Sequence, residues 1–140
     1  MSQAFETAQA FFAACEQPLG SQGCAPFTAE NATFSAQSEP LVDINTVAGY
    51  ADWMHAFGTV TAKGAHYTLH HQAWDESTRT ALFFATYHAT HVGDGGPVPP
   101  TGQSTNSDYV YAITMNDQDK VQHVTKIWNA PWALKELGWG

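Results

Sequence analysis

The stretch THVGDGGPVPPTGQST, from Thr90 to Thr105, ends a strand-like segment with a loop that is dense in glycine and proline. Glycine reaches backbone conformations that other residues avoid, and proline fixes its own φ angle, so such a loop takes a defined path. The loop lies between two strand-like segments and not between two domains. We therefore expect it at the rim of a pocket, connecting two strands of one sheet.

Four segments around this loop have the composition of β-strands, because they are rich in β-branched and aromatic residues. In chain order they are His66–Trp74, Thr80–His91, Asp108–Met115 and Val121–Trp128. The polar connections 75–77 and 116–119 are short enough to be hairpin turns. We therefore expect the four strands to be mostly antiparallel neighbours.

The first half of the chain has the spacing of helices. Apolar residues recur every three or four positions from about Gln3 to Gln17, which predicts an amphipathic helix. A second helix, capped by Asn45, is indicated by an aromatic face with the same spacing. This face consists of Tyr50, Trp53, Met54 and Phe57. Residues 31–37 can form a short strand between the two helices.

The order of these elements, helices first and then a run of strands, is typical of an α+β fold. After the strands we expect a last helical turn that Asn129 caps and Gly138 ends. The chain has 140 residues, which is the size of one domain, and it shows no internal repeat. We therefore expect a single domain over residues 1–140.

The charge and the N-terminal sequence exclude several classes of partner. The formal net charge is −8 and Arg79 is the only arginine, so phosphate backbones would be repelled and nucleic-acid binding is not expected. The first residues lack the pattern of a secretion signal, and no segment approaches the roughly 20 apolar residues of a membrane span. We expect a cytoplasmic protein with no membrane partner. In that reducing compartment, Cys15 and Cys24 are expected to be free thiols.

Short motifs in the chain resemble those of the SnoaL-like polyketide cyclases, a family of the NTF2-like superfamily. The resemblance lies in the loop after the second long strand, in the turn before the last strand and in the closing helical segment. The matching segments are Thr90–Gly93, Pro99–Gly102, Asp119–Val121, Trp128–Asn129 and Leu134–Gly138. Together with the order of helices and strands, the resemblance covers nearly the whole chain.

The resemblance implies a cone in which a curved, mostly antiparallel sheet wraps around the N-terminal helices and leaves an apolar pocket at one end. Family members commonly form homodimers through the sheet. They include cyclases, isomerases and dehydratases, which suggests cofactor-independent acid–base chemistry on a carbonyl or polyketide-like compound. They also include non-catalytic domains, so a ligand-binding or homodimerising domain is the alternative. Nothing in the sequence calls for a nucleotide, a flavin or a metal.

The carboxylates that such enzymes use as bases have no counterpart at the matching positions. The first strand has none between Ala32 and Ala36, and the last strand has Thr125 or Lys126 where SnoaL-type cyclases place an acidic residue. Lys126 could act as a base if it points into the pocket and burial lowers its pKa. The favoured alternative is that Lys126 points outward as a solvated strand residue.

Histidines are the other catalytic candidates, because imidazole exchanges protons near neutral pH. His66 and His91 could lie on adjacent strands, with Tyr111 or Tyr109 as hydrogen-bond donors. The resemblance supports this pairing through scytalone dehydratase, a distant member of the superfamily that uses two histidines with tyrosines. A purely structural role for each histidine is the favoured alternative.

The histidines are not expected to bind a metal. Strand alternation places His70 and His71 on opposite faces of the sheet, and likewise His88 and His91. Neither pair has a carboxylate or cysteine partner at a suitable spacing.

Aromatic side chains are expected to line the pocket. Core packing is the simpler role for the aromatic face of the second helix, but in a cone the same helix also lines the cavity. The residues that we expect to contact a ligand are Tyr50, Trp53, Phe57, Phe84 and Trp128. Stacking on such rings would favour a small apolar ligand that contains a flat ring.

Overall fold

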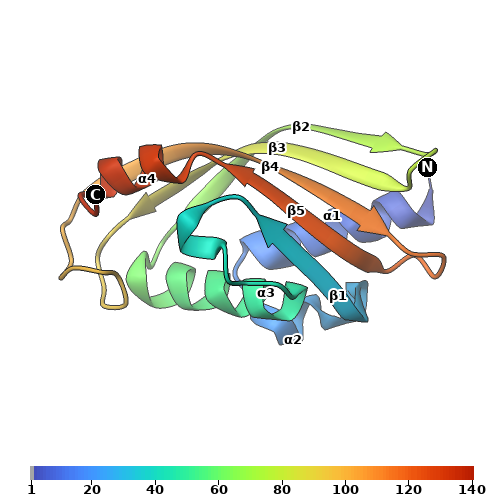
Figure 1. Cartoon of the computed structure of the whole chain (residues 1–140), viewed down its shortest axis with the longest axis horizontal. Helices are drawn as coiled ribbons and strands as arrows, with labels where there is room; N and C mark the ends of the chain where they lie inside the picture. The colour runs from blue at the N-terminus through green and yellow to red at the C-terminus, as the bar shows by residue number, and fades with distance from the viewer. Residues whose placement is uncertain (1) are drawn as a thin grey trace.

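The molecule consists of a curved sheet with helices packed on one of its faces (Figure 1). The computed structural model describes residues 2–140. The strands are β1 (Thr28–Ala36), β2 (His66–Asp75), β3 (Thr80–Thr90), β4 (Ser104–Met115) and β5 (Val121–Trp128). The helices are α1 (Gln3–Glu16), α2 (Gly20–Cys24), α3 (Val47–Ala56) and α4 (Ala130–Leu137). The expected α+β cone is confirmed, with the sheet left open.

The sheet has the order β1-β5-β4-β3-β2. The three pairings among β2, β3, β4 and β5 are antiparallel, as the short turns predicted. Strand β4 begins at Ser104, four residues before the expected start, because its polar first residues continue the ladder opposite Thr90. Strand β1 pairs in parallel with β5 at one edge of the sheet, and β2, which follows helix α3 in the chain, lies at the other edge.

A bulge in β2 changes which face its histidines occupy. The register slips between Leu69 and His71, so His70 and His71 lie together opposite Phe84. We had expected these two histidines on opposite faces, and that prediction was wrong, because a bulge adds a residue and resets the alternation. Both rings lie near the ring of Phe84, with centroids 5.1 and 6.3 Å away.

Helix α3 carries the expected aromatic face, but its cap and its end differ from the prediction. The side chain of Thr46, and not that of Asn45, accepts a hydrogen bond from the backbone N–H of Gly49. After Ala56 the helix widens into a π-helical turn, Phe57–Thr61. Turns of this kind often occur at functional sites, because the extra residue re-aims the side chains that it carries.

The glycine and proline loop is fixed to the end of that π-helical turn. The backbone N–H groups of Val92 and Gly93 both donate to the carbonyl of Thr61, each at 3.0 Å. A side chain at Gly93 would place its Cβ 2.1 Å from the carbonyl oxygen of Val60, so the close approach requires glycine here. Figure 1 shows this loop, the end of α3 and helix α4 gathered at one end of the molecule.

The C-terminal helix follows the predicted caps. The side chain of Asn129 accepts a hydrogen bond from the backbone N–H of Trp132, and Gly138 ends α4 in a left-handed conformation with φ at 77°. Helix α4 packs against β4 and so covers one end of the sheet.

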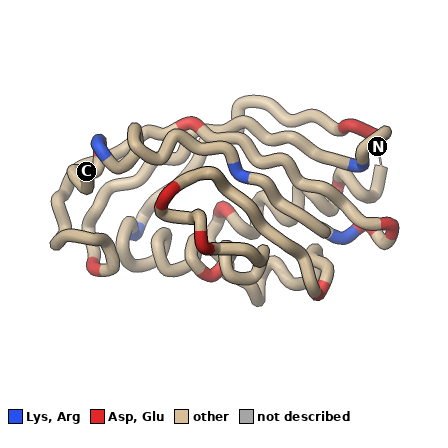
Figure 2. Tube along the Cα trace, viewed as in Figure 1, with Lys and Arg blue, Asp and Glu red and all other residues tan. Residues whose placement is uncertain are grey.

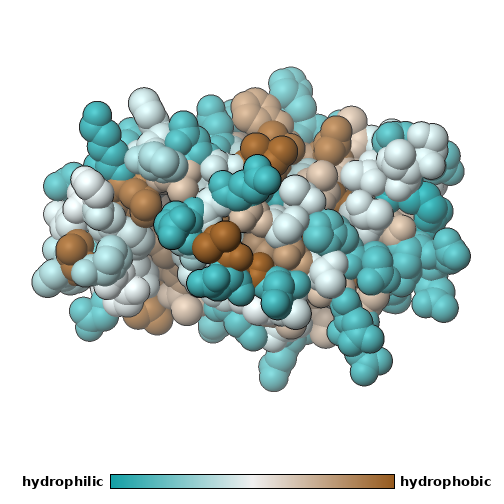
Figure 3. Space-filling view, viewed as in Figure 1, coloured by the Kyte–Doolittle hydropathy of each residue, from teal (hydrophilic) through white to brown (hydrophobic). Residues whose placement is uncertain are grey.

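The surface is acidic and mixed in polarity. Figure 2 shows that the few basic residues are scattered along the trace and form no basic patch among residues 2–140. On the face drawn in Figure 3, apolar side chains form small separate patches among polar ones. Within the same residues, no helix has the length and apolar character that crossing a membrane requires.

Candidate active site

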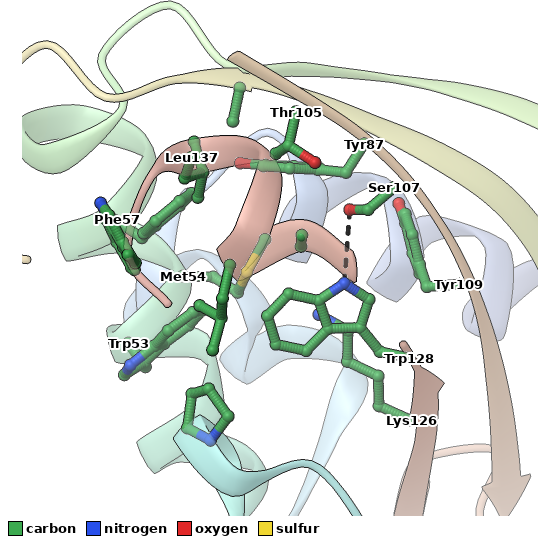
Figure 4. A pocket seen from close by; sticks show the side chains of 15 residues that line it. Trp53, Met54, Phe57, Tyr87, Thr105, Ser107, Tyr109, Lys126, Trp128 and Leu137 are labelled. Atoms are coloured by element: carbon green, nitrogen blue, oxygen red, sulfur yellow. Dashed lines mark hydrogen bonds between the residues drawn. The ribbon is translucent and has the colours of Figure 1, made fainter. Parts of the chain in front are cut away.

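A narrow apolar cavity lies between α3, α4 and the inner face of the sheet (Figure 4), and we name it the inner cavity. Its walls include Trp53, Phe57, Tyr87, Tyr109, Lys126 and Trp128. The volume open to the centres of water molecules is about 40 Å³, which is room for about three waters. The inner cavity can therefore hold only a small chemical group.

A wider cavity adjoins the inner cavity, and we name it the outer cavity. It offers about 450 Å³ by the same measure. The two cavities share five wall residues, among them the rings of Trp53, Phe57 and Trp139. Gly95 and Pro97 of the glycine and proline loop line the outer cavity, so the loop lies at the rim of a pocket, as the sequence predicted.

Lys126 is buried and points inward from β5, with only 7% of its surface exposed. The outward orientation that we favoured from the sequence was wrong, because Lys126 follows the inward alternation of Val124 and Trp128. Its ammonium nitrogen lies 4.7 Å from the centre of the Trp128 ring and 5.3 Å from that of Tyr109. Such ring faces attract a cation and exclude water.

A chain of hydrogen bonds joins Lys126 to a buried carboxylate. The Nζ of Lys126 donates to the hydroxyl of Tyr50 at 2.9 Å, and the hydroxyls of Tyr50 and Tyr111 are bonded to each other. The hydroxyl of Tyr111 donates to Oε2 of Glu16 at 2.9 Å, and that of Tyr109 donates to Oε1. Because Tyr111 gives its one proton to Glu16, Tyr50 must be the donor to Tyr111. Each hydrogen bond in the series is therefore donated in the direction from the amine to the carboxylate.

Burial favours the neutral forms of Lys126 and Glu16, the two ends of this series of hydrogen bonds. Desolvation lowers the pKa of Lys126 to about 8, against an opposing effect of Glu16. Desolvation also raises the pKa of Glu16, opposed by Lys126 and by the hydrogen bonds from Tyr109 and Tyr111. A pKa of about 8 leaves roughly a tenth of the amine neutral at pH 7, far more than for an ordinary lysine. The site thus holds a free amine in an apolar setting.

Tyr87 contributes a hydroxyl that has no partner. It projects from the inner face of β3 into the wall of the inner cavity, and its oxygen is buried without a hydrogen bond to any residue in 2–140. Burial raises the pKa of Tyr87, so the phenol keeps its proton. A buried donor without a partner is costly, which makes Tyr87 well suited to bind an oxygen atom of a ligand.

Most of the expected ligand-binding residues do gather at the site. Trp53, Phe57 and Trp128 line the inner cavity, where the Trp128 indole donates to the Ser107 hydroxyl at 3.3 Å (Figure 4). Tyr50 lies behind this wall and contributes through its hydrogen bond to Lys126. The aromatic face of α3 therefore serves both as core and as cavity wall.

Phe84 and His66 lie on the opposite, outer face of the sheet. Phe84 alternates with the buried Phe83 and is 37% exposed, so its predicted contact with a ligand in the cavity is wrong. His66 pairs with His88 across β2 and β3, and both rings lie outside, 4.8 Å apart. The structure therefore separates His66 from Lys126 and from the predicted partner His91.

His91 faces inward but takes part in the loop and not in the wall of either cavity. Its Nδ1 accepts hydrogen bonds from the Trp139 indole at 2.9 Å and from the backbone N–H of Thr101 at 3.3 Å. Its Nε2 lies close to Gly96 and has no partner among the described residues. These contacts hold the loop over the end of β3, which favours the structural role that we had set against a catalytic one.

Two residues of the site were absent from the sequence-based prediction. Glu16 was missed because a carboxylate was sought on strands, although its spacing from Phe12 places it on the buried face of α1. Tyr87 was not predicted, although it alternates with the buried Phe83 and Ala85 on the inner face of β3. No cluster of three or more metal-binding side chains occurs in residues 2–140.

Solved structures show which fold this is. AclR from Streptomyces galilaeus, which carries a provisional assignment as a hydroxylase, has a TM-score of 0.76 and 18% identity, over 100% of this chain and 87% of AclR. A protein from Jannaschia sp. CCS1, provisionally a SnoaL-like polyketide cyclase, has a TM-score of 0.75 and 13% identity, over 99% and 93% of the two chains. These similarities confirm the SnoaL-like, NTF2-like fold.

A third similar structure belongs to a different kind of enzyme. The BvnE pinacolase from Penicillium brevicompactum has a TM-score of 0.71 and 13% identity, over 95% of this chain and 90% of BvnE. No protein-family model and no curated protein matches the sequence. At such identities the likeness shows a shared fold, and the chemistry must be argued from the residues of this chain.

Proposed function

We propose that this protein is a cofactor-independent enzyme of the lyase or isomerase type that acts by acid–base chemistry on a small apolar carbonyl compound. One observation carries the proposal, namely the hydrogen-bonded chain that ends in the buried amine of Lys126 at the wall of an apolar cavity. The assignments of similar folds as polyketide cyclase and pinacolase support the same class of reaction.

Lys126 would serve as the base and Tyr87 as the donor. The neutral amine of Lys126 takes a proton from the carbon next to the carbonyl, and the Tyr87 hydroxyl donates a hydrogen bond to the oxygen on which negative charge develops. Glu16, bonded to Tyr109 and Tyr111, holds the tyrosines in place and compensates the positive charge that Lys126 gains. The surrounding rings exclude water and strengthen these electrostatic interactions.

Exchange of carbon-bound protons tests this proposal. Aryl ketones and aldehydes are incubated with the protein in deuterated water, and loss of the α-proton signal is followed by NMR. We expect the wild-type protein to accelerate exchange, Lys126→Met to abolish the acceleration, and Tyr87→Phe to reduce it about 100-fold. Circular dichroism checks that each variant folds.

Two matched substitutions control for nonspecific effects. Tyr67→Phe removes a hydroxyl that does not line the inner cavity, and Lys63→Met removes an exposed amine. Both should exchange protons at the wild-type rate. The enzymatic proposal would be refuted if none of the probes exchanged faster with the protein than in buffer alone. It would also be refuted if the wild-type protein and Lys126→Met gave equal rates. Either result would leave a non-catalytic ligand-binding domain.

That alternative also includes a homodimer formed through the outer face of the sheet. Leu82, Phe84 and Ile127 on this face are 45%, 37% and 64% exposed, and Phe84 and Ile127 lie in register on either side of Val110, so they form an apolar patch. We propose that a second copy of the chain covers them, in a dimer compatible with either function. Sedimentation equilibrium should then show a dimer at micromolar concentration, and a monomer alone would rule it out.

A further inference from the structure

We infer that Lys126 is also a nucleophile that condenses with an aldehyde or an unhindered ketone to form an imine at the inner cavity. This chemistry goes beyond proton transfer because it joins the ligand covalently to the chain. It uses the same amine as the proposed function, so the two require separate measurements.

The amine is held at one point only. Its hydrogen bond to the Tyr50 hydroxyl is the one contact of Nζ with a hydrogen-bonding group in residues 2–140, and no carboxylate oxygen lies within ion-pair distance of it. Arg79 and Asp119 form the only ion pair in that part of the chain. The rest of the surroundings of Nζ consists of aromatic rings and the inner cavity. In the neutral amine, the nitrogen lone pair therefore has no hydrogen-bond donor to bind among the described residues.

The surroundings of the amine favour an imine once it forms. Imines hydrolyse in water, and the rings of Trp128, Tyr50 and Tyr109 surround Nζ at centroid distances of 4.7, 5.2 and 5.3 Å. A desolvated lysine of this kind is an activated nucleophile. The other three lysines, Lys63, Lys120 and Lys135, are all exposed.

The condensation balances with the groups at hand. The Nζ–C bond forms as Nζ attacks the carbonyl carbon, and a proton moves from nitrogen to oxygen to give a carbinolamine. The C–O bond then breaks, and the two amine hydrogens leave with the carbonyl oxygen as one water molecule. The donor that we propose for that oxygen is the hydroxyl of Tyr87, which lines the same cavity and has no partner among the described residues. No oxidant, reductant or cofactor takes part.

The two cavities define the class of carbonyl compound. The inner cavity admits a small head group, because only about 40 Å³ is open to water centres, whereas the outer cavity offers about 450 Å³. The rings shared by the two cavities, including Trp53 and Phe57, would contact the part of the ligand that crosses between them. The preferred compound is therefore an aldehyde or methyl ketone on a narrow apolar or aromatic body.

Reductive trapping tests the inference. Cinnamaldehyde and sodium cyanoborohydride are added to the folded protein near neutral pH, and the modified lysines are identified by peptide mass spectrometry at short times. We expect Lys126 to be modified at least about tenfold faster than Lys63, Lys120 or Lys135, because desolvation lowers its pKa to about 8 and leaves roughly a tenth of its amine neutral near pH 7. Prior unfolding in guanidinium should bring the four rates together, which corrects for differences in peptide detection.

A second variant separates nucleophilic attack from folding. Tyr87→Phe keeps Lys126 and should slow its modification severalfold, whereas Tyr67→Phe should leave the rate unchanged. Modification of Lys126 no faster than that of the exposed lysines in the folded protein would overturn the imine. If the imine is not trapped but the NMR measurement still shows accelerated proton exchange, the proposed function stands without the imine. If the imine is trapped but exchange is not accelerated, the imine is supported and the proposed function is refuted.

Discussion

The two faces of the sheet place ionisable side chains in opposite environments. On the inner face, Lys126 lies in a closed aromatic setting and its pKa falls to about 8 because of desolvation. On the outer face, the half-buried His88 ring is bonded to the Thr68 hydroxyl at 2.8 Å and to the Asn106 side chain at 2.7 Å. Four histidines, His66, His70, His71 and His88, thus lie on the face opposite the inner cavity.

Under the proposed function, burial and not residue type selects the reactive group. A histidine exchanges protons near neutral pH without help, whereas a lysine does so only after its charge is destabilised. The inner face supplies that change through the rings around Lys126, which keep it from solvent, whereas the buried Glu16 opposes it.

The largest effect is expected for removal of the inner amine. Lys126→Met should lower proton exchange at least about 100-fold, because it removes the base, while methionine fills a similar volume. NMR exchange rates measure this change. The matched change on the outer face, His66→Ala, should leave the rate within about twofold of wild type, and a large loss there would show that the outer face participates in the reaction.

The pH dependence of stability is the second expected effect. Because the folded pKa of Lys126 is about 8 and the unfolded value is 10.5, the unfolded chain binds more protons between these values. The free energy of unfolding should therefore rise with pH, by about 2 kcal/mol between about pH 7.5 and pH 9.5. Urea titrations of wild type and Lys126→Met isolate this term, since the variant should lack the rise. Identical slopes would show that the amine is solvated.

Loss of the inner carboxylate should have an intermediate effect. Glu16→Gln keeps the shape but replaces an acceptor of two tyrosine hydrogen bonds, which we expect to lower the free energy of unfolding by about 1–3 kcal/mol. Without the negative charge, the pKa of Lys126 should fall further, so the exchange rate should reach its plateau at lower pH. A stability equal to wild type would mean that the chain of hydrogen bonds contributes little.

Substitutions on the outer face should have the smallest effect on the chemistry. Phe84→Ser leaves the cavity walls untouched, so we expect wild-type proton exchange within about twofold. The same change should weaken the proposed dimer, and sedimentation of wild type and variant at matched concentrations measures this. A loss of exchange together with the dimer would indicate that assembly supports the site.

The sequence predicted the architecture better than the site. Helical spacing, strand composition and short turns were sufficient for the order of elements, and the glycine and proline content of residues 93–102 indicated the rim of the pocket. The inward orientation of Lys126 could also be predicted from the sequence, because Lys126 lies two positions from both Val124 and Trp128 on the same strand. It was misjudged because an exposed lysine is the common case.

Other features depend on tertiary packing that the sequence does not reveal. The bulge at His70 reverses the face of the following residues, and no local composition marks it. The pairing of β1 with β5 brings Lys126 beside the helix that carries Tyr50, through contacts distant in the chain. The bond between Tyr111 and Glu16 is likewise a contact across 95 positions. Long-range contacts of this kind assemble the site, and local periodicity cannot supply them.

A direct titration of Lys126 tests the central claim. With 13C-labelled lysine, the Cε signals of all four lysines are followed by NMR as the pH is raised, and Lys126→Met identifies the signal of interest. We predict that the Lys126 signal titrates with a midpoint of about 8. A Lys126 midpoint above about 10 would contradict a buried reactive amine.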